Sequence, residues 1–174
     1  MKRAKWLILA GILMIIFFAF DYSLLSFLDA IKFSSLDRFF SILLFIQKEP
    51  YFEIWLVCFM FFLMLLKKEK KNFPKFLIAF VLAAIVNLAL KIIIARPRPI
   101  EGTNSFPSGH ATLLFTTIPF LEQKAIKISW TIFVFLLVFT RVYFKIHFFS
   151  DVAGAFIIGY GFALLAKKIK WKKA

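Results

Sequence analysis

Long uninterrupted runs of apolar residues dominate the chain and predict membrane-spanning helices. An α-helix rises about 1.5 Å per residue, so about 20 apolar residues cross the hydrocarbon core of a bilayer. Six runs approach that length; the fourth is short and is expected to begin earlier or to tilt. The predicted spans are Lys5–Phe20, Tyr51–Leu66, Lys75–Ala95, Gly109–Leu121, Ile128–Tyr143 and Ser150–Ala166.

The segment between the first two predicted spans, Asp21–Glu49, has a different pattern. Apolar residues fall three or four positions apart between Leu24 and Leu43, and polar residues fill the positions between them. This spacing is typical of amphipathic helices that lie at the membrane interface. We expect one or two such helices, broken near residues 33–35, and we expect their apolar face to form part of a docking surface for a lipid.

Composition supports one membrane-embedded domain over residues 1–174. Of the 174 residues, 62% are hydrophobic and 26 are phenylalanine, which is more apolar surface than a soluble domain of this size can bury. The chain is therefore predicted to be an all-α polytopic membrane protein with six transmembrane helices and an interfacial segment after the first. The single cysteine, Cys58, lies in an apolar run, so no intramolecular disulfide is possible.

The net charge of +14 reflects membrane topology rather than binding to nucleic acid. Most lysines gather at the N-terminus, in residues 67–75 and 124–127, and after residue 166. If the spans alternate, these segments share one side of the membrane, and the positive-inside rule places that side in the cytoplasm. Both termini are therefore predicted to be cytoplasmic. The basic start is interpreted as part of a retained first helix, because no small-residue cleavage site follows it.

Many of the remaining charges crowd two short connections on the opposite, extracytoplasmic side. One joins the third and fourth spans, the other joins the fifth and sixth, and together they hold both histidines of the chain. The groups of interest are Lys91, Arg96, Arg98, Pro107-Ser108-Gly109-His110, Thr140, Arg141, His147 and Asp151.

Several of these groups suit a phosphate. Lys91, Arg98 and Arg141 offer ammonium and guanidinium donors, which bind phosphate oxygens through charge-assisted hydrogen bonds. Ser108 and Gly109 precede an apolar helix, whose first backbone N–H groups favour an anion. Taken singly, Lys91 can be a snorkelling side chain that reaches the membrane interface, and the Ser108–Gly109 turn can simply cap a helix. Their convergence on one membrane face favours a phosphate site.

Both histidines and one aspartate can serve phosphoryl transfer. His147 and Asp151 are four residues apart, so they share a face on a helical turn. A carboxylate there keeps one imidazole nitrogen protonated and leaves the other free to attack phosphorus. His110 can protonate the leaving alkoxide. Taken singly, Asp151 also fits an acid that complements a helix dipole.

In these motifs the sequence resembles the type 2 phosphatidic acid phosphatase superfamily of membrane lipid phosphatases. The family pattern is Lys, six residues, Arg-Pro; then Pro-Ser-Gly-His; then Ser-Arg, five residues, His, three residues, Asp. The matching segments are residues 91–99, 107–110 and 140–151. Thr140 stands where serine is usual and keeps the hydroxyl, so only the packing beside the following arginine is affected.

The resemblance implies a role for each residue of the pattern. His147 would be the nucleophile that forms a phosphohistidine, Asp151 would orient it, and His110 would be the general acid that later helps water to attack. The phosphate would be held by Lys91, Arg98, Ser108, Gly109 and Arg141. No metal and no cofactor are implied, and the sequence shows no competing cluster of metal ligands.

The resemblance also implies a substrate class and a location, namely a lipid phosphate in the bacterial inner membrane with the site on the periplasmic side. Short bacterial members include lipid A 1-phosphatases, phosphatidylglycerolphosphate phosphatases and undecaprenyl diphosphate phosphatases. The compact chain and the extra cations Arg96, Lys145 and Lys48 favour lipid A 1-phosphate first and the other two lipids in that order. Considered alone, Arg96 is interpreted as a ligand of lipid headgroups and Lys145 as a rim charge.

Two other classes of function stay open. One is a lipid phosphotransferase on the same scaffold, and the other is a non-catalytic lipid-binding or transport protein. Soluble vanadium-dependent haloperoxidases share the anion pocket, but the membrane spans argue against that assignment. The sequence does not predict an oligomeric state.

Overall fold

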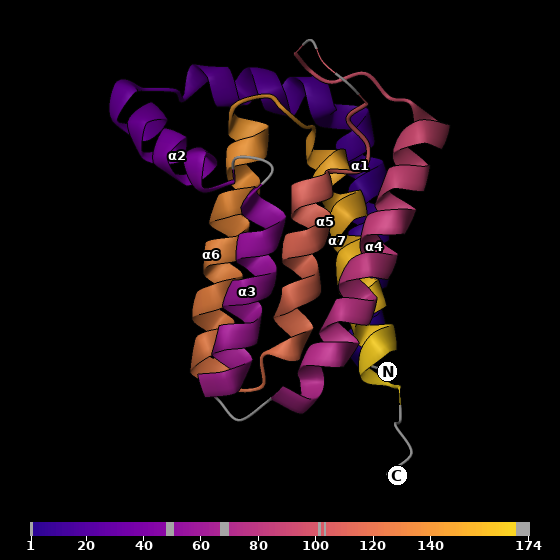
Figure 1. Cartoon of the computed structure of the whole chain (residues 1–174). Coiled ribbons are helices and arrows are strands. Elements are labelled where there is room, and N and C mark those ends of the chain that lie inside the picture. The colour runs from indigo at the N-terminus through magenta and orange to yellow at the C-terminus, as the bar shows by residue number, and fades with distance from the viewer. Residues whose placement is uncertain (1, 48–50, 67–69, 101, 103, 170–174) are drawn as a thin grey trace.

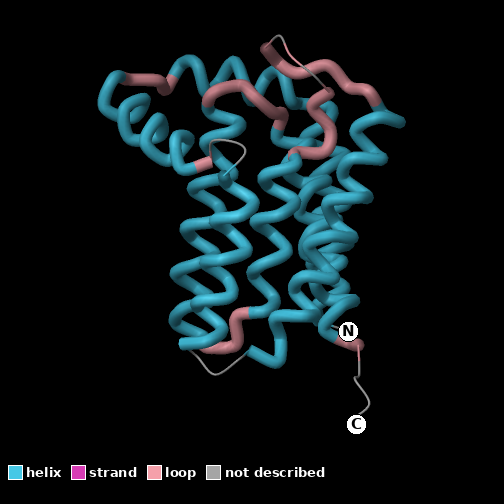
Figure 2. The backbone as a smooth tube through the Cα atoms, in the orientation of Figure 1, coloured by secondary structure: helices cyan, strands magenta, loops and turns pink. Residues whose placement is uncertain are grey.

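The structure, a computed structural model, describes residues 2–47, 51–66, 70–100, 102 and 104–169. Over these residues every regular element is a helix, as the sequence predicts, and the connections are short loops (Figure 2). The elements are α1 (Lys2–Ala30), α2 (Ser34–Ile46), α3 (Tyr51–Leu66), the 3-10 turn η1 (Lys70–Asn72), α4 (Phe73–Ile94), α5 (Gly109–Thr117), the 3-10 turn η2 (Ile118–Phe120), α6 (Lys124–Tyr143) and α7 (Phe149–Lys167).

Helix α5 forms the centre of the bundle, with α4 and α7 on one side and α3 and α6 on the other (Figure 1). Every side chain from His110 to Thr117 is buried. Helix α7 approaches α5 closely at Gly159, where an added Cβ would lie 2.1 Å from the carbonyl oxygen of Thr112. Small residues allow such close backbone contacts between membrane helices. The contact fixes the position of α7 relative to α5, the helix that begins with the Ser-Gly-His motif.

The end of α4 turns the chain back toward the bundle. Ala95 adopts a left-handed conformation with φ 47° and ends the helix, and prolines at 97 and 99 prevent its continuation. The returning chain is held by two hydrogen bonds. Ser105 N–H donates to the Arg96 carbonyl at 2.7 Å, and the Asn104 side chain donates to the Lys91 carbonyl at 2.9 Å. The Pro-Ser-Gly-His motif is thereby brought back beside α4.

The first 46 residues depart most from the sequence prediction. The first span was predicted to end at Phe20, but α1 continues through Asp21 to Ala30, and its last turns cross the end of the bundle (Figure 1). The break falls at residues 31–33, close to the predicted position. Helix α2 is amphipathic, as predicted, and buries Phe40 and Leu43. Residues 48 and 49 of the predicted interfacial segment lie outside the described residues.

Four helical segments are long and apolar enough to cross a membrane, or five if α2 and α3 form one bent span. Their outward side chains are largely apolar, which suits helices whose solvent is lipid. The fourth predicted span corresponds to α5, which has nine residues and continues into η2. The four segments are Gly11–Ala30, Lys70–Ile94, Lys124–Tyr143 and Phe149–Lys167.

Both termini of the described chain lie at one end of the bundle, and the two connections that carry the histidines lie at the other (Figures 1 and 2). The predicted candidate residues therefore gather at a single end of the molecule.

Candidate active site

A polar cavity of about 170 Å³ opens where the two histidine-bearing connections meet. Its lining includes six of the eight predicted site residues, contributed by α4, α5, the end of α6 and the two connections. The lining residues are Glu53, Ala84, Asn87, Lys91, Arg98, Gly109, His110, Leu113, Arg141, Ile146 and His147. The other two predicted residues, Ser108 and Asp151, adjoin lining residues and are fully buried.

His147 is held by Asp151 at the start of α7. The Nδ1 atom of His147 lies 3.3 Å from Oδ2 of Asp151, and the same oxygen accepts the backbone N–H of Phe148 at 2.9 Å. The contact with Phe148 closes the first turn of the helix, so the carboxylate both caps α7 and orients the imidazole. With Nδ1 facing the carboxylate, Nε2 is the nitrogen available to the cavity.

The surroundings of His147 favour its neutral form. Burial lowers the pKa of its imidazole below the ordinary value, and the nearby cations Arg98 and Lys91 act in the same direction. The Asp151 carboxylate raises the pKa and offsets part of this effect. A neutral imidazole keeps a lone pair on one nitrogen, which is the form needed for nucleophilic attack.

The start of α5 has features that suit an anion. Ser108 precedes the helix, and its hydroxyl is buried with no hydrogen-bond partner among the residues that the structure describes. A Cβ added at Gly109 would lie 3.9 Å from Nζ of Lys91, so the ammonium group stands over the first turn. An unpaired buried hydroxyl, a helix N-terminus and an ammonium group together suit a phosphate oxygen.

Asn87 supports this turn and was missed in the sequence analysis. It lies on α4 one turn before Lys91, is buried, and donates from Nδ2 to the Pro107 carbonyl at 3.3 Å and to Thr112 Oγ1 at 2.8 Å. These bonds tie the Pro-Ser-Gly turn to α4. An isolated asparagine in an apolar run gave no local signal of this role.

Gln47, directly after α2, was also missed. Its side-chain oxygen accepts Nε of Arg141 at 3.0 Å, and its backbone carbonyl accepts Nη2 of the same guanidinium at 3.0 Å. That carbonyl also lies 3.0 Å from Nε2 of His110. The Gln47 amide donates to Thr140 Oγ1 at 2.9 Å. The threonine that replaces the usual serine therefore uses its hydroxyl to hold Gln47, which in turn holds the arginine.

Arg96 does not lie at the lipid surface. Its Nη2 atom lies 2.9 Å from Asp21 Oδ2 and its Nη1 atom lies 3.1 Å from Asp151 Oδ1. The rings of Phe18 and Phe148 lie 4.2 and 3.9 Å from its guanidinium carbon. The interpretation of Arg96 as a ligand of lipid headgroups is therefore wrong, because buried protein groups occupy the guanidinium. Asp21 was missed as a partner of the site.

Three cations of the cavity, Lys91, Arg98 and Arg141, face one carboxylate, Glu53, which the sequence analysis did not single out. Such an excess of positive charge can neutralise a phosphate dianion beside the His147 imidazole. No group of three or more His, Cys, Asp or Glu side chains within the described residues is arranged to hold a metal ion.

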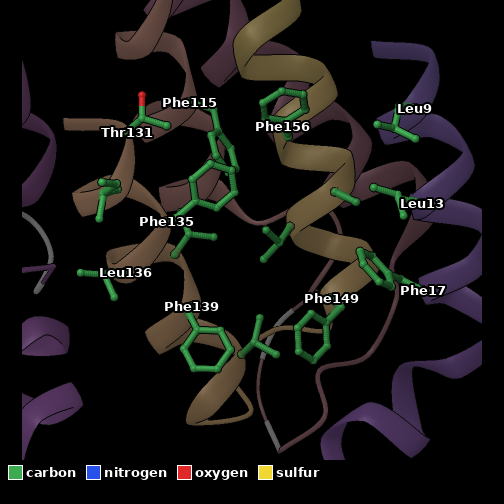
Figure 3. Close-up of a pocket in the computed structure, with 15 residues that line it drawn as sticks. Leu9, Leu13, Phe17, Phe115, Thr131, Phe135, Leu136, Phe139, Phe149 and Phe156 are labelled. Carbon is green, nitrogen blue, oxygen red and sulfur yellow. The ribbon is translucent and has the colours of Figure 1, made fainter. Parts of the chain in front are cut away.

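A larger cavity, about 680 Å³, lies away from these groups between α1, α6 and α7 (Figure 3). Leu9, Leu13 and Phe17 of α1 face Phe135 and Phe139 of α6 across it. None of the predicted site residues lines this cavity, and its lining carries no charged side chain. Apart from Thr131, whose hydroxyl donates to the Lys127 carbonyl, its lining offers hydrocarbon contact and no charged group that could bind or transfer a phosphate.

Comparison with protein families matches residues 72–174 to the model described as the PAP2 superfamily. The match includes both histidine-bearing connections and more than half of the chain. The chain belongs to the PAP2 superfamily. This family contains phosphoric ester hydrolases, so the predicted enzyme class is confirmed at the level of the family.

The chain is similar to a curated protein in sequence and to two crystal structures in fold. The chain is 26% identical over 123 residues to an undecaprenyl-diphosphatase of Sulfolobus acidocaldarius, a match covering 62% of this chain and 60% of that protein. The crystal structure of Aquifex aeolicus LpxE aligns with a TM-score of 0.71 and 25% identity over 86% of this chain and 95% of LpxE.

A further crystal structure, described as the first transmembrane PAP2-type phosphatidylglycerolphosphate phosphatase from Bacillus subtilis, aligns with a TM-score of 0.68 and 22% identity. This alignment covers 92% of the present chain and 94% of the Bacillus protein. Together with the apolar helices, the shared fold makes this chain a multi-pass membrane protein.

Proposed function

We propose that this PAP2 protein hydrolyses the phosphomonoester or diphosphate of a membrane lipid, without a metal ion, through a phosphohistidine at His147. The observation that carries the proposal is the buried His147–Asp151 pair at the wall of a cavity lined by Lys91, Arg98 and Arg141. Phosphoryl transfer needs positioning and neutralisation of charge, and this arrangement provides both.

In the proposed first step, the three cations and the Ser108–Gly109 turn bind the phosphoryl oxygens. Nε2 of His147 attacks phosphorus, and the bond to the lipid oxygen breaks. The proton of His110 goes to the leaving alkoxide. Asp151 holds Nδ1–H and stabilises the positive charge that develops on the ring, as the carboxylate does in other His-carboxylate pairs.

In the proposed second step, His110 takes a proton from a water molecule whose oxygen attacks the phosphohistidine. The bond between phosphorus and Nε2 breaks, inorganic phosphate leaves, and His147 returns to its neutral form. His110 ends the cycle protonated, ready to act again as the acid.

The polar cavity of about 170 Å³ is termed the phosphate cavity from here on. A second cavity, of about 460 Å³, lies beside it and supports a lipid as the substrate. It shares His110 and Arg141 with the phosphate cavity, and Ser41, Leu44 and Phe45 of α2 line its other side. Because His110 acts on the leaving oxygen, the lipid body lies against these α2 residues. The proposed docking surface therefore consists of these α2 residues, which belong to the amphipathic segment that follows the first predicted span.

Phe40 does not belong to that docking surface. It is 6% exposed, and its ring centroid lies 5.4 Å from that of Phe139 and 4.7 Å from that of Tyr143. Replacing it would therefore damage the core rather than test lipid binding, whereas Phe45 is 74% exposed and is suited to such a test.

For the substrate, we keep lipid A 1-phosphate first, phosphatidylglycerol phosphate second and undecaprenyl diphosphate third. The compact chain supports this order, but the structure weakens the charge argument for lipid A. Arg96 points inward, Lys145 pairs with Asp29, and Lys48 lies outside the described residues. The names of the Bacillus and Sulfolobus relatives support the second and third lipids.

We further propose a single domain with six spans, formed by α1, α3, α4, α5 with η2, α6 and α7, in the bacterial inner membrane. Both termini would be cytoplasmic and the phosphate cavity periplasmic. Two observations support this orientation. The termini lie at the end of the bundle opposite the two connections that help to line the cavity (Figure 1). The η1 turn, which carries the exposed Lys70 and Lys71, lies at the same end as the termini, as the positive-inside rule requires.

The test is release of inorganic phosphate by purified protein in detergent with EDTA, from each of the three lipids. His147→Ala is compared with Asp29→Ala, a change at an exposed ion pair. We expect release that survives EDTA, vanishes in His147→Ala and persists in Asp29→Ala. Phosphate appearing in a second lipid would indicate a phosphotransferase, and no release or transfer would contradict an enzymatic function on these lipids.

A further inference from the structure

Asp21 of α1 is a buried carboxylate that the proposed mechanism does not use. It is 1% exposed, and it lies outside the family match, which begins at residue 72. Its Oδ1 atom accepts the backbone N–H of Ser150 at 3.1 Å. Its Oδ2 atom accepts Nη2 of Arg96 at 2.9 Å and the hydroxyl of Ser150. A buried charge persists only where partners compensate its desolvation, so these contacts explain an aspartate within α1.

Arg96 connects this carboxylate to the proposed nucleophile. While Nη2 binds Asp21, Nη1 donates to Ser150 Oγ at 2.6 Å and to Asp151 Oδ1 at 3.1 Å. A guanidinium group is a rigid planar fork, so the position of one terminal nitrogen determines the position of the other. The anchor on α1 therefore fixes where Arg96 meets Asp151.

The two oxygens of Asp151 have separate tasks. Oδ1 binds Arg96, and Oδ2 receives the Phe148 N–H and faces Nδ1 of His147. The contact with Arg96 fixes the rotation of the carboxylate about its last bond. This rotation determines the direction in which the imidazole is held.

We propose that Asp21 and Arg96 are positioning residues for phosphoryl transfer, which hold Asp151 so that His147 Nε2 is aimed at phosphorus. This inference rests on the proposed function of His147. Neither Asp21 nor Arg96 lines the phosphate cavity, so they act on the step of attack and not on phosphate binding.

The kinetic consequence follows from this geometry. Lys91, Arg98 and Arg141 keep their places when the network is weakened, so binding of the phosphoryl group is preserved. A misplacement of about 1 Å at a reacting atom lowers the rate about 10²-fold. Weakening the network therefore lowers kcat and leaves KM nearly unchanged.

The test compares Asp21→Asn and Arg96→Lys with wild type, using the best lipid of the panel and orthovanadate as a phosphate analogue. The matched control is Asp29→Asn, which makes the same change on the same helix at an ion pair whose carboxylate side chain is 48% exposed. We expect kcat to fall about 10²-fold in both test variants, with KM and the vanadate inhibition constant within about threefold of wild type. Asp29→Asn should stay within about twofold of wild type in kcat.

A kcat within about twofold of wild type in both test variants would overturn the inference, and so would an equal loss in the control. If vanadate binding in Arg96→Lys weakened as much as kcat fell, Arg96 would be assigned to phosphate binding, and this result would also overturn the inference. If Asp21→Asn does not fold, Arg96→Lys and Ser150→Ala carry the same test. Release that persists in His147→Ala refutes the proposed function itself, whereas an inactive His147→Ala with fully active test variants refutes only the positioning role.

Discussion

Gly159→Ala is expected to disturb the site from within the bundle. The added Cβ would meet the Thr112 carbonyl oxygen at 2.1 Å, whereas ordinary contact begins at 3.4 Å, so the α5 and α7 backbones must separate by about 1.3 Å. The obstacle is a backbone atom, which no change of rotamer can move aside. His110 lies two residues before Thr112 on the same short helix and would move with it.

The size of the effect follows from this displacement. Overpacking of this kind costs about 1–3 kcal/mol, against a gain of about 0.5–1 kcal/mol from replacing a helical glycine. A shift of about 1 Å at a reacting group lowers the rate about 10²-fold. Gly159→Ala should therefore lower kcat/KM about 10²-fold and lower the Tm in detergent.

The matched control is Gly11→Ala on α1, where an added Cβ meets nothing within 4 Å. It should keep the activity and Tm of the wild type or gain slightly in Tm. The reasoning would be refuted if Gly159→Ala matched Gly11→Ala in both kcat/KM and Tm, because the close contact would then set neither the packing nor the site.

Three further predictions follow from the site and its orientation. Because burial lowers the pKa of His147, its imidazole should lose its proton at a lower pH than an ordinary histidine. A ¹⁵N NMR titration of the His110→Asn variant, which leaves His147 as the remaining histidine, should give a midpoint below about 6.5. A midpoint at or above that value would contradict this prediction. Gln47→Ala removes the side-chain acceptor of the Arg141 guanidinium, so the vanadate inhibition constant should rise about 10-fold, and an unchanged constant would show that Gln47 does not position the arginine. In a cysteine-free background, Ile100→Cys should react with an impermeant maleimide on intact cells and Lys71→Cys only after permeabilisation; the reverse pattern would refute the proposed orientation.

The apolar runs allowed most helices to be predicted closely. The predicted span Tyr51–Leu66 equals α3, and the last two spans differ from α6 and α7 by a few residues at their starts and by at most one at their ends. Helix ends followed local signals such as the prolines after Ala95. The gathering of Lys91 and His147 at one cavity followed from spacing and alternation, because Lys91 in the last turn of α4 and His147 on the connection before α7 lie at the same end of the bundle.

Residues whose roles depend on distant partners could not be predicted. In the sequence alone, Asp21 indicates the end of a span, because a charged residue in an apolar helix is costly. Its compensating partners lie 75 and 129 residues further along the chain. Gln47 meets Arg141 across 94 residues. Arg96 was misassigned for the same reason, since no local pattern shows that its charge is buried against α1.

The central claim is that His147 carries the phosphoryl group without help from a metal ion. The most direct measurement is to mix the protein with ³²P-labelled lipid phosphate in EDTA, quench in alkali and locate the label by mass spectrometry. The account predicts an alkali-stable, acid-labile label on His147 that is absent from His147→Ala. Label that persists in His147→Ala, or activity that disappears in EDTA and returns with a divalent cation, would contradict it.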